Sequence, residues 1–334
     1  MLPYCSGVSH KGVRRTVTIT VLGLIDVLLT LLVPVWVPIT IVYDVVRGKF
    51  RLPTTRLMLF GLCWAWIESA GVFLLFAIWV VGRGNNHAAH YRMQRWWCGR
   101  IIAALRVTVG LRVEVVGADN VGPGPYVVFC RHASLADSII SCFIVNNTMG
   151  FRPRYVLKSD LEKVPCLDLL GHRTPNCFVR RGSSNVRAEL EALGSMMHGL
   201  AEGDAAVIFP EGSRANPVKR ERELSRLAER HPERHERLSS LKRLLPPKPA
   251  GAQSMLDAAP GADVITVWHE GLDGLDTFPG MLHALSERKV TAHVVVTVHR
   301  RAEVPDGGGF AEWIDRRWVE MDDAVAQFTQ VAGV

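Results

Sequence analysis

The stretch VVFCRHASLADSIISC, residues 127–142, determines how the chain around it folds. An apolar run ends at Arg131-His132, and five residues after the histidine Asp137 opens another apolar segment with helical spacing. On one continuous helix this separation would place His132 and Asp137 on different faces. The two side chains meet only if His132 follows a strand and Asp137 lies in the first turn of a helix. The stretch therefore predicts a strand, a turn and a helix.

The pair formed by His132 and Asp137 has two interpretations. In one, Asp137 accepts an imidazole N–H and leaves the second ring nitrogen of His132 to act as a general base. In the other, Ser134-x-x-Asp137 is only a capping pattern at the start of a helix. Because the chain has 12 histidines, the spacing also arises by chance. The pair by itself does not decide between these interpretations.

A second polar group follows the apolar run at residues 205–209, in the string FPEGSR, residues 209–214. Glu211, Gly212, Ser213 and Arg214 come together at the end of an expected strand, where ligands bind in α/β proteins. Gly212 permits a close approach of the backbone, and Arg214 offers a planar donor fork to a phosphate. The alternative is a plain turn with a surface arginine, but the composition of the string favours an anion site.

The sequence after residue 100 alternates between strand and helix signals. Short apolar or β-branched runs predict strands at residues 107–116, 126–130, 155–158, 177–180, 205–209, 264–268 and 293–299. Helical spacing predicts helices at residues 134–145, 186–200, 220–245 and 310–331. Residues 101–334 are therefore expected to form one α/β domain with a largely covered sheet. The charged helix 220–245 is expected to be solvated, with contact to lipid head groups or a carrier as the alternative.

The first hundred residues are expected to form a membrane-anchoring module of two hydrophobic helices and a basic linker. Residues 16–42 and 57–81 are apolar runs, interrupted only by Asp26 and Glu68, and each is as long as the roughly 20 residues that cross a bilayer. The first run is too long for a cleaved secretory signal. Basic residues flank every end, so spanning and hairpin arrangements both stay open. The two acids are expected to face each other or to lie near an interface.

Composition limits the classes of partner. With 48% hydrophobic residues the chain is not disordered as a whole, and its net charge of +7 suits an anionic partner. Two hydrophobic segments disfavour a nucleic-acid-binding protein. The seven cysteines form no C-x-x-C pair and are expected to be buried thiols, and no metal-binding constellation is evident.

In order and spacing, the motifs resemble those of the glycerolipid acyltransferases, which acylate lysophosphatidic acid and related lysophospholipids. Arg131-His132-x-x-x-x-Asp137 is similar to the first block of that family, Asn-His-x-x-x-x-Asp, and FPEGSR is similar to Phe-Pro-Glu-Gly-(Thr/Ser)-Arg. Three further segments resemble the blocks Lys-x-x-Leu-x-x-(Ile/Val)-Pro, Phe-Ile-Asp-Arg and Leu-x-Pro-(Arg/Lys)-x-x-Gly: residues 158–165, 178–181 and 244–251. The resemblance extends from about residue 126 to residue 330, and hydrophobic N-terminal helices also fit the family.

The resemblance implies a mixed, mostly buried sheet covered by helices, like that of glycerol-3-phosphate acyltransferase. It implies transfer of a fatty acyl group from acyl-CoA or acyl carrier protein to the free hydroxyl of a lysophospholipid, in the first place lysophosphatidic acid to phosphatidic acid. His132 would be the general base, and Asp137 would orient it. The substrate would be bound by Lys158, Arg181, Glu211, Gly212, Ser213 and Arg214.

No cofactor or metal is expected beyond the acyl donor. The expected partners are the acceptor, the donor and membrane lipids, and not nucleic acid. We expect an integral or deeply embedded membrane protein with its catalytic domain on the cytoplasmic face.

Three positions depart from the family pattern. Arg131 stands in place of Asn, Arg180 in place of an acid, and Pro175 in place of a common Gly. An extra positive charge at the mouth of the site would favour a larger or more anionic acceptor. Two alternatives therefore accompany the main hypothesis. One is an acyltransferase acting on a larger lysophospholipid or a glycolipid, and the other is a catalytically inactive membrane protein that binds anionic lipid.

Overall fold

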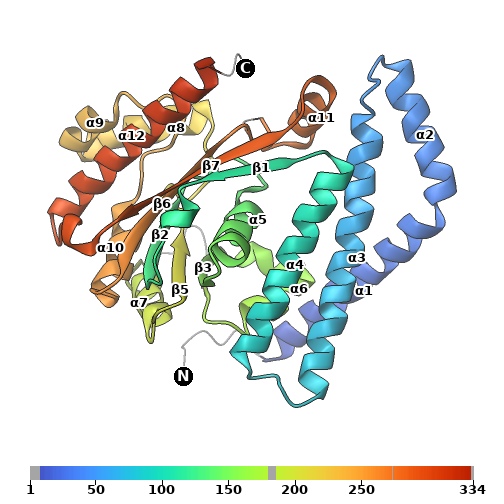
Figure 1. Cartoon of the computed structure of the whole chain (residues 1–334), viewed down its shortest axis with the longest axis horizontal. Helices are drawn as coiled ribbons and strands as arrows, with labels where there is room; N and C mark the ends of the chain where they lie inside the picture. Colours follow the sequence, from blue (N-terminus) through green and yellow to red (C-terminus); the bar gives the residue numbers. More distant parts are fainter. Residues whose placement is uncertain (1–7, 180–185, 273, 332–334) are drawn as a thin grey trace. The chain divides into compact units, whose positions relative to one another are not determined.

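A computed structural model describes residues 8–179, 186–272 and 274–331 (Figure 1). The chain divides into two compact units. The first, here called the helical unit, comprises residues 1–111, 157–184 and 281–290. The second, the sheet unit, comprises residues 112–156, 185–280 and 291–334. The helical unit thus extends past the predicted boundary at residue 100 and includes two later segments, because these pack on the N-terminal helices.

Four long helices dominate the helical unit: α1 (Val8–Leu31), α2 (Val33–Val46), α3 (Pro53–Val80) and α4 (His87–Thr108). The later segments add η3 (Ser159–Lys163), α6 (Pro165–Gly171), β4 (Cys177–Val179) and most of α11 (Phe278–Glu287). Helices α3 and α4 run side by side (Figure 1), and α1 and α6 also pack against α3. The predicted strand 107–116 is partly wrong, since α4 continues to Thr108. Gly110, with φ +69°, then turns the chain toward the first strand.

The first apolar run forms two helices, where one was expected. Helices α1 and α2 are bent by 72° relative to each other at a break near Leu32. Pro34 lies in the first turn of α2, where its missing N–H costs nothing, and its ring is incompatible with a continuous helix from α1. Among the described residues, α3 is the one unbroken helix long and apolar enough to cross a membrane, and α1 with α2 passes that test only as a bent pair.

The two acids in these runs have separate partners. Asp26 accepts a hydrogen bond from the Ser69 hydroxyl. Glu68 accepts one from Trp97 Nε1 at 2.7 Å and one from the Cys166 N–H at 3.1 Å. Of the two expectations, the one that Asp26 and Glu68 face each other is not supported, and a position near an interface stays a prediction. Each acid instead fixes helix packing by a buried polar contact.

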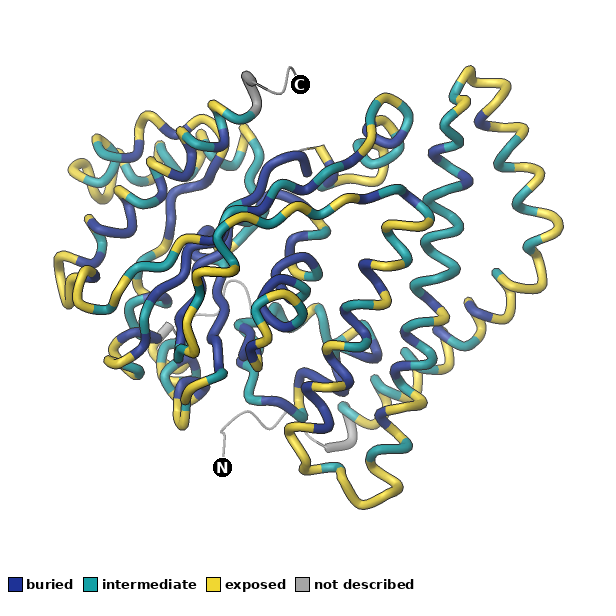
Figure 2. The backbone as a smooth tube through the Cα atoms, in the orientation of Figure 1, coloured by how far each residue is buried: buried dark blue, intermediate teal, exposed yellow. Residues whose placement is uncertain are grey.

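The strands of the sheet unit follow the order β1-β7-β6-β2-β5-β3. Their bounds are β1 (Arg112–Val116), β2 (Tyr126–Cys130), β3 (Arg152–Lys158), β5 (Asp204–Ile208), β6 (Asp263–Glu270) and β7 (Thr291–His299). Strand β2 pairs in parallel with β5 and β6, and β3 with β5, whereas β6 and β7 are antiparallel. The expected mixed sheet is confirmed. Its central strands β2 and β5 are buried along their whole length (Figure 2).

Helices pack on this sheet, and further helices complete the unit. They are α5 (Asp137–Cys142), which continues into the π-helix η2 (Phe143–Thr148), α7 (Val186–Met197), α8 (Pro217–Arg230), α9 (Pro232–Leu238), α10 (Pro249–Ala258) and α12 (Gly309–Val331); the 3-10 turns η1 (Ala118–Asn120) and η4 (Arg301–Glu303) complete the unit. Helix α10 packs on β2, and α12 packs on β6 and α9.

The predicted helix 220–245 is broken in the structure. Pro232 has no N–H to continue α8, so it starts α9 instead, and residues 239–248 are not helical. The expectation of a solvated helix holds for α8, which has no buried residue. The chain that follows α9 is folded back into the site described next.

Candidate active site

His132 and Asp137 are held in contact by the strand, turn and helix that contain them. Strand β2 ends at Cys130, and Asp137 is the first residue of α5. The His132 Nδ1 atom lies 2.9 Å from Asp137 Oδ2. The imidazole packs against the Phe209 ring with centroids 4.8 Å apart. The His132 side chain keeps 18% of its surface exposed while that of Asp137 keeps 1%, so the histidine is the member of the pair that a substrate can reach.

Asp137 also caps the turn that precedes α5. It accepts hydrogen bonds from the backbone N–H groups of Ala133 and Ser134 and from the Ser134 hydroxyl. On its other side, the Nε2 atom of His269 lies 3.1 Å from Oδ1. Burial raises the pKa of Asp137, but the two histidines outweigh it and hold that pKa well below its ordinary value. The capping and the pairing interpretations of the sequence are therefore compatible, because one carboxylate does both.

The FPEGSR segment and the residue after it hold the backbone of His132 by hydrogen bonds. Glu211 Oε1 accepts the N–H of His132 at 2.8 Å, and Oε2 accepts the N–H of Leu245 at 3.0 Å. The N–H of Ala215 donates to the carbonyl of His132 at 2.8 Å. Burial raises the pKa of Glu211 to about 8, against the opposing effect of these N–H donors and of Arg131. Glu211 thus holds the backbone at His132, and each of its carboxylate oxygens accepts a backbone N–H.

The turn after Glu211 presents cationic groups. Gly212 has a φ of +67°, and a Cβ there would lie 3.4 Å from the Nζ atom of Lys248. The backbone N–H of Lys248 donates to the Pro210 carbonyl at 2.9 Å, which ties residues 244–251 to this turn. Arg214 is half-buried and makes a long contact from Nη1 to the Asp276 carbonyl at 3.4 Å, and Ser213 is half-buried beside it. The turn and the neighbouring Lys248 therefore bring together donors of a kind that can bind an anion.

Comparison with known proteins identifies this part of the chain. Residues 112–270 match the family model described as Acyltransferase. This segment is an acyltransferase domain. The fold is similar to that of the 1-acyl-sn-glycerophosphate (LPA) acyltransferase PlsC from Thermotoga maritima, with a TM-score of 0.52 and 16% identity over 83% of this chain and 98% of that one. No curated protein matches the chain in sequence.

The acyltransferase domain brings most of the predicted site residues into the sheet unit. His132, Asp137, Glu211, Gly212, Ser213 and Arg214 all belong to it. Lys158 belongs to the helical unit, where it forms an ion pair with Asp160. Arg181 and Arg180 lie outside the described residues. A role for Lys158 and Arg181 in binding the acceptor stays a prediction.

Arg131 does not occupy the position expected of it. Its side chain is 1% exposed, and its Nη1 atom donates to the carbonyl of His269. A buried guanidinium cannot add charge at the mouth of the site, so Arg131 is not the extra positive charge expected there. Arg131 instead faces Glu211 and joins the ends of β2 and β6 beneath His132.

Two residues near the site were absent from the predicted set. His269 lies near the carboxyl end of β6, next to β2, and Lys248 lies in the segment similar to the family's fourth block. The rule that ligands bind at the carboxyl ends of parallel strands would have singled out His269. Only the return of residues 244–251 to the FPEGSR turn shows that Lys248 belongs with it.

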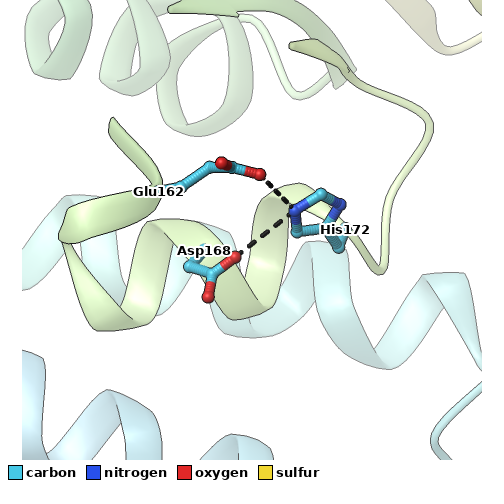
Figure 3. A group of neighbouring side chains, drawn as sticks. All are labelled: Glu162, Asp168 and His172. Atoms are coloured by element: carbon cyan, nitrogen blue, oxygen red, sulfur yellow. Dashed lines mark hydrogen bonds and ion pairs between the residues drawn. The ribbon is translucent and has the colours of Figure 1, made fainter. Parts of the chain in front are cut away.

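The helical unit contains an ionic cluster of Glu162, Asp168 and His172 (Figure 3). His172 Nε2 lies 2.8 Å from Glu162 and 3.3 Å from Asp168. Arg14 binds both acids at 2.8 Å, and Arg15 binds Asp168 at 2.9 Å. The two guanidinium groups neutralise these carboxylates, so the cluster is an ion-pair network that fastens α1 to α6, and its geometry does not favour a metal centre.

Proposed function

We propose that the chain is a membrane-associated O-acyltransferase. It moves a fatty acyl group from an acyl thioester to the free hydroxyl of a lysophospholipid. The observation that carries this proposal is the 2.9 Å contact between His132 Nδ1 and Asp137 Oδ2 within an acyltransferase domain. A carboxylate that accepts Nδ1–H leaves Nε2 unprotonated and available as a base.

The proposed reaction has one chemical step. His132 Nε2 removes the proton of the acceptor hydroxyl while the oxygen attacks the thioester carbonyl. The C–S bond then breaks, and the imidazolium returns the proton to the leaving thiolate. An ester and a free thiol are formed, and Asp137 stabilises the imidazolium in between. No covalent enzyme intermediate is required, and the sequence contains no G-x-S-x-G nucleophile motif.

Lysophosphatidic acid is the proposed acceptor. The turn that carries Gly212, Arg214 and the neighbouring Lys248 offers donors that suit a phosphate monoester, and Lys158 and Arg181 are proposed to add to them. The structurally similar Thermotoga protein is described as acting on the same class of acceptor. Acyl-CoA or acyl carrier protein is the proposed donor, with no metal or other cofactor.

The helical unit is proposed to hold the enzyme on a membrane, with the sheet unit on the cytoplasmic side. Large apolar side chains are exposed along α1, α2 and α3, among them Leu28, Ile39, Phe73 and Trp79. Such a concentration of exposed apolar surface favours a lipid environment. The length and composition of α3 agree with this proposal.

The test is acyl transfer by the full-length protein and by two variants. Thiol release from acyl-CoA and the lipid product, measured by mass spectrometry, are followed with a panel of acceptors: lysophosphatidic acid, larger lysophospholipids and lysoglycolipids. We expect phosphatidic acid from the wild type. In His132→Ala and Asp137→Asn, kcat/KM should fall by about 10²-fold or more because the general base is lost or misoriented.

His283→Ala, at an exposed position on α11, is the matched control and should keep full activity. A His132→Ala variant with near wild-type turnover would contradict the mechanism. If a larger acceptor gives more product than lysophosphatidic acid does, that acceptor becomes the proposed substrate. Lipid binding without thiol release in the wild type would instead support the catalytically inactive alternative.

A further inference from the structure

His269 lies under the active site on the opposite side of Asp137 from His132. It is 4% exposed and belongs to β6, which pairs with the strand that leads to His132. Its Nε2 atom lies 3.1 Å from Asp137 Oδ1, while His132 uses Oδ2. At this distance His269 stabilises the charged form of Asp137. Asp137 therefore bridges two imidazole rings.

The orientation of His269 is fixed by its surroundings. Its Nδ1 atom is buried and has no hydrogen-bond partner among the described residues. A lone pair on Nε2 facing a carboxylate would be repelled, so the tautomer or cation that carries hydrogen on Nε2 is the stable one. The Arg131 guanidinium binds the carbonyl of His269 and fixes the backbone that places the ring. The contact is thus built by two neighbouring strands.

Among the described residues, two other titratable groups interact with Asp137. The charge of Asp137 adds to burial in raising the pKa of Glu211, and burial keeps the pKa of the Cys130 thiol well above its ordinary value, so that thiol stays neutral. Arg131 faces Glu211 and the His269 carbonyl. The two histidines are the groups that hold the pKa of Asp137 low. Both histidines interact with the same carboxylate charge.

We infer that His269 is a positioning residue that limits how strongly Asp137 holds a proton on His132. A carboxylate that is shared with a second imidazole stabilises the His132 imidazolium less than an unshared one would. A weaker hold on that proton favours an imidazole that can accept a proton from a substrate hydroxyl, as a general base does. The kinetic meaning of this inference rests on the proposed function, while the effect on His132 itself does not.

Two variants of the full-length enzyme test the inference. In His269→Gln the amide nitrogen occupies nearly the position of Nε2 and can still donate to Asp137. In His269→Asn the amide is too short to reach it. Three backbone and hydroxyl donors continue to hold Asp137 in both variants. Removal of the His269 donor alone should therefore leave the carboxylate in place with more of its charge available to His132.

The readouts are the acidic limb of kcat/KM against pH and the titration midpoint of His132. The midpoint is followed by nitrogen NMR of histidine-labelled protein, with the signal assigned by its loss in His132→Ala. We expect His269→Asn to move both upward by about 0.5 to 1 pH unit, with the high-pH plateau within about threefold of wild type. His269→Gln should move them little. Dividing each profile by that of the wild type cancels ionisation of the lipid phosphate.

His299→Asn, on the adjacent strand β7, is the matched control and should move neither readout. If the acidic limb of kcat/KM stays where it is in both His269 variants, the inference is overturned. It is also overturned if the high-pH plateau falls while the acidic limb does not move, because loss of packing alone produces that result. If the wild type transfers no acyl group but the His132 midpoint still moves in His269→Asn, the proposed function fails and the inference stands.

Discussion

Asp137 uses the same oxygen, Oδ2, for backbone N–H groups of the turn before α5 and for the imidazole of His132. An isolated buried carboxylate would be protonated, but the donors around this one stabilise its charged form. Beneath it, Glu211 is in the opposite situation, since burial dominates and favours its neutral form. Two buried acids within one site therefore have pKa values displaced in opposite directions.

The titration of Glu211 should appear in the stability of the protein. Its pKa is about 8 in the folded chain and near 4.5 when exposed, so between these values the folded state holds a proton that the unfolded chain loses. The free energy of unfolding from this group should therefore fall as pH rises from about 4.5 through 8, by up to about 4 kcal/mol. Urea denaturation at pH 5, 6.5 and 8 measures it, and Glu211→Gln should lack this component.

Glu221→Gln, at an exposed position on α8, is the control for a general effect of removing one acid. It should keep the wild-type dependence of stability on pH. If Glu211→Gln keeps it as well, Glu211 does not titrate in this range.

At the scale of elements, α12 orders the segment that reaches the candidate active site. Asp315 is buried and binds Arg234 at 2.6 Å and Arg237 at 3.2 Å, which fixes α9. Two turns later, Asp322 accepts the backbone N–H groups of residues 242, 243 and 244, each at 2.7 Å. The next N–H, that of Leu245, is the one that Glu211 accepts. A helix far along the chain thus supports the backbone of His132.

Asp322→Asn should destabilise the sheet unit. Its amide nitrogen would face N–H donors in place of an acceptor, and the buried groups left unpaired should cost about 2–3 kcal/mol of unfolding free energy. Thermal unfolding followed by circular dichroism measures this loss. Asp323→Asn changes the adjacent, exposed position and should cost almost nothing. Equal stability of the two variants would show that the three contacts do not hold residues 242–244.

At the scale of the whole molecule, exposed apolar surface is unevenly distributed along the chain. Most of the exposed large apolar side chains among the described residues fall between Val13 and Val81, within the helical unit. Helix α3 has Phe73, Phe76 and Trp79 exposed, while its opposite side packs on α4. This distribution supports the proposed association of the helical unit with lipid, while the charged helix α8 is exposed to water.

Charges placed on α3 should weaken that association. The double variant Phe73→Asp, Phe76→Asp would put two carboxylates into hydrocarbon, each at a cost of about 2.5–3.5 kcal/mol near the centre of a helix. Co-flotation of the full-length protein with phospholipid vesicles should therefore fall sharply. Val218→Asp on α8 is the control and should float as the wild type does. Unchanged flotation of the double variant would place the lipid-binding surface elsewhere.

Much of the fold follows from local sequence pattern. The strands at residues 126–130 and 264–268 and the turn at FPEGSR are set by runs of apolar residues and by glycine, and these act over a few positions. The same holds for the meeting of His132 with Asp137, because strand, turn and helix place them together within six residues. The sequence pattern did not predict helix α4 or the break at Pro232. In α4, arginines interrupt the apolar face and obscure its helical spacing. At Pro232, a single proline within a charged run ends one helix and starts the next.

The sequence by itself determined the α/β class, the hydrophobic character of the first hundred residues and the His132 and Asp137 pair. Only the tertiary structure decided that Arg131 is buried, that Glu211 binds two backbone N–H groups and that His269 shares Asp137. The physical reason is separation along the chain. The contact between residues 131 and 269 depends on which strands become neighbours in the sheet, and the contact between 211 and 245 depends on how α12 orders the segment after α9. The local pattern carries no information about either.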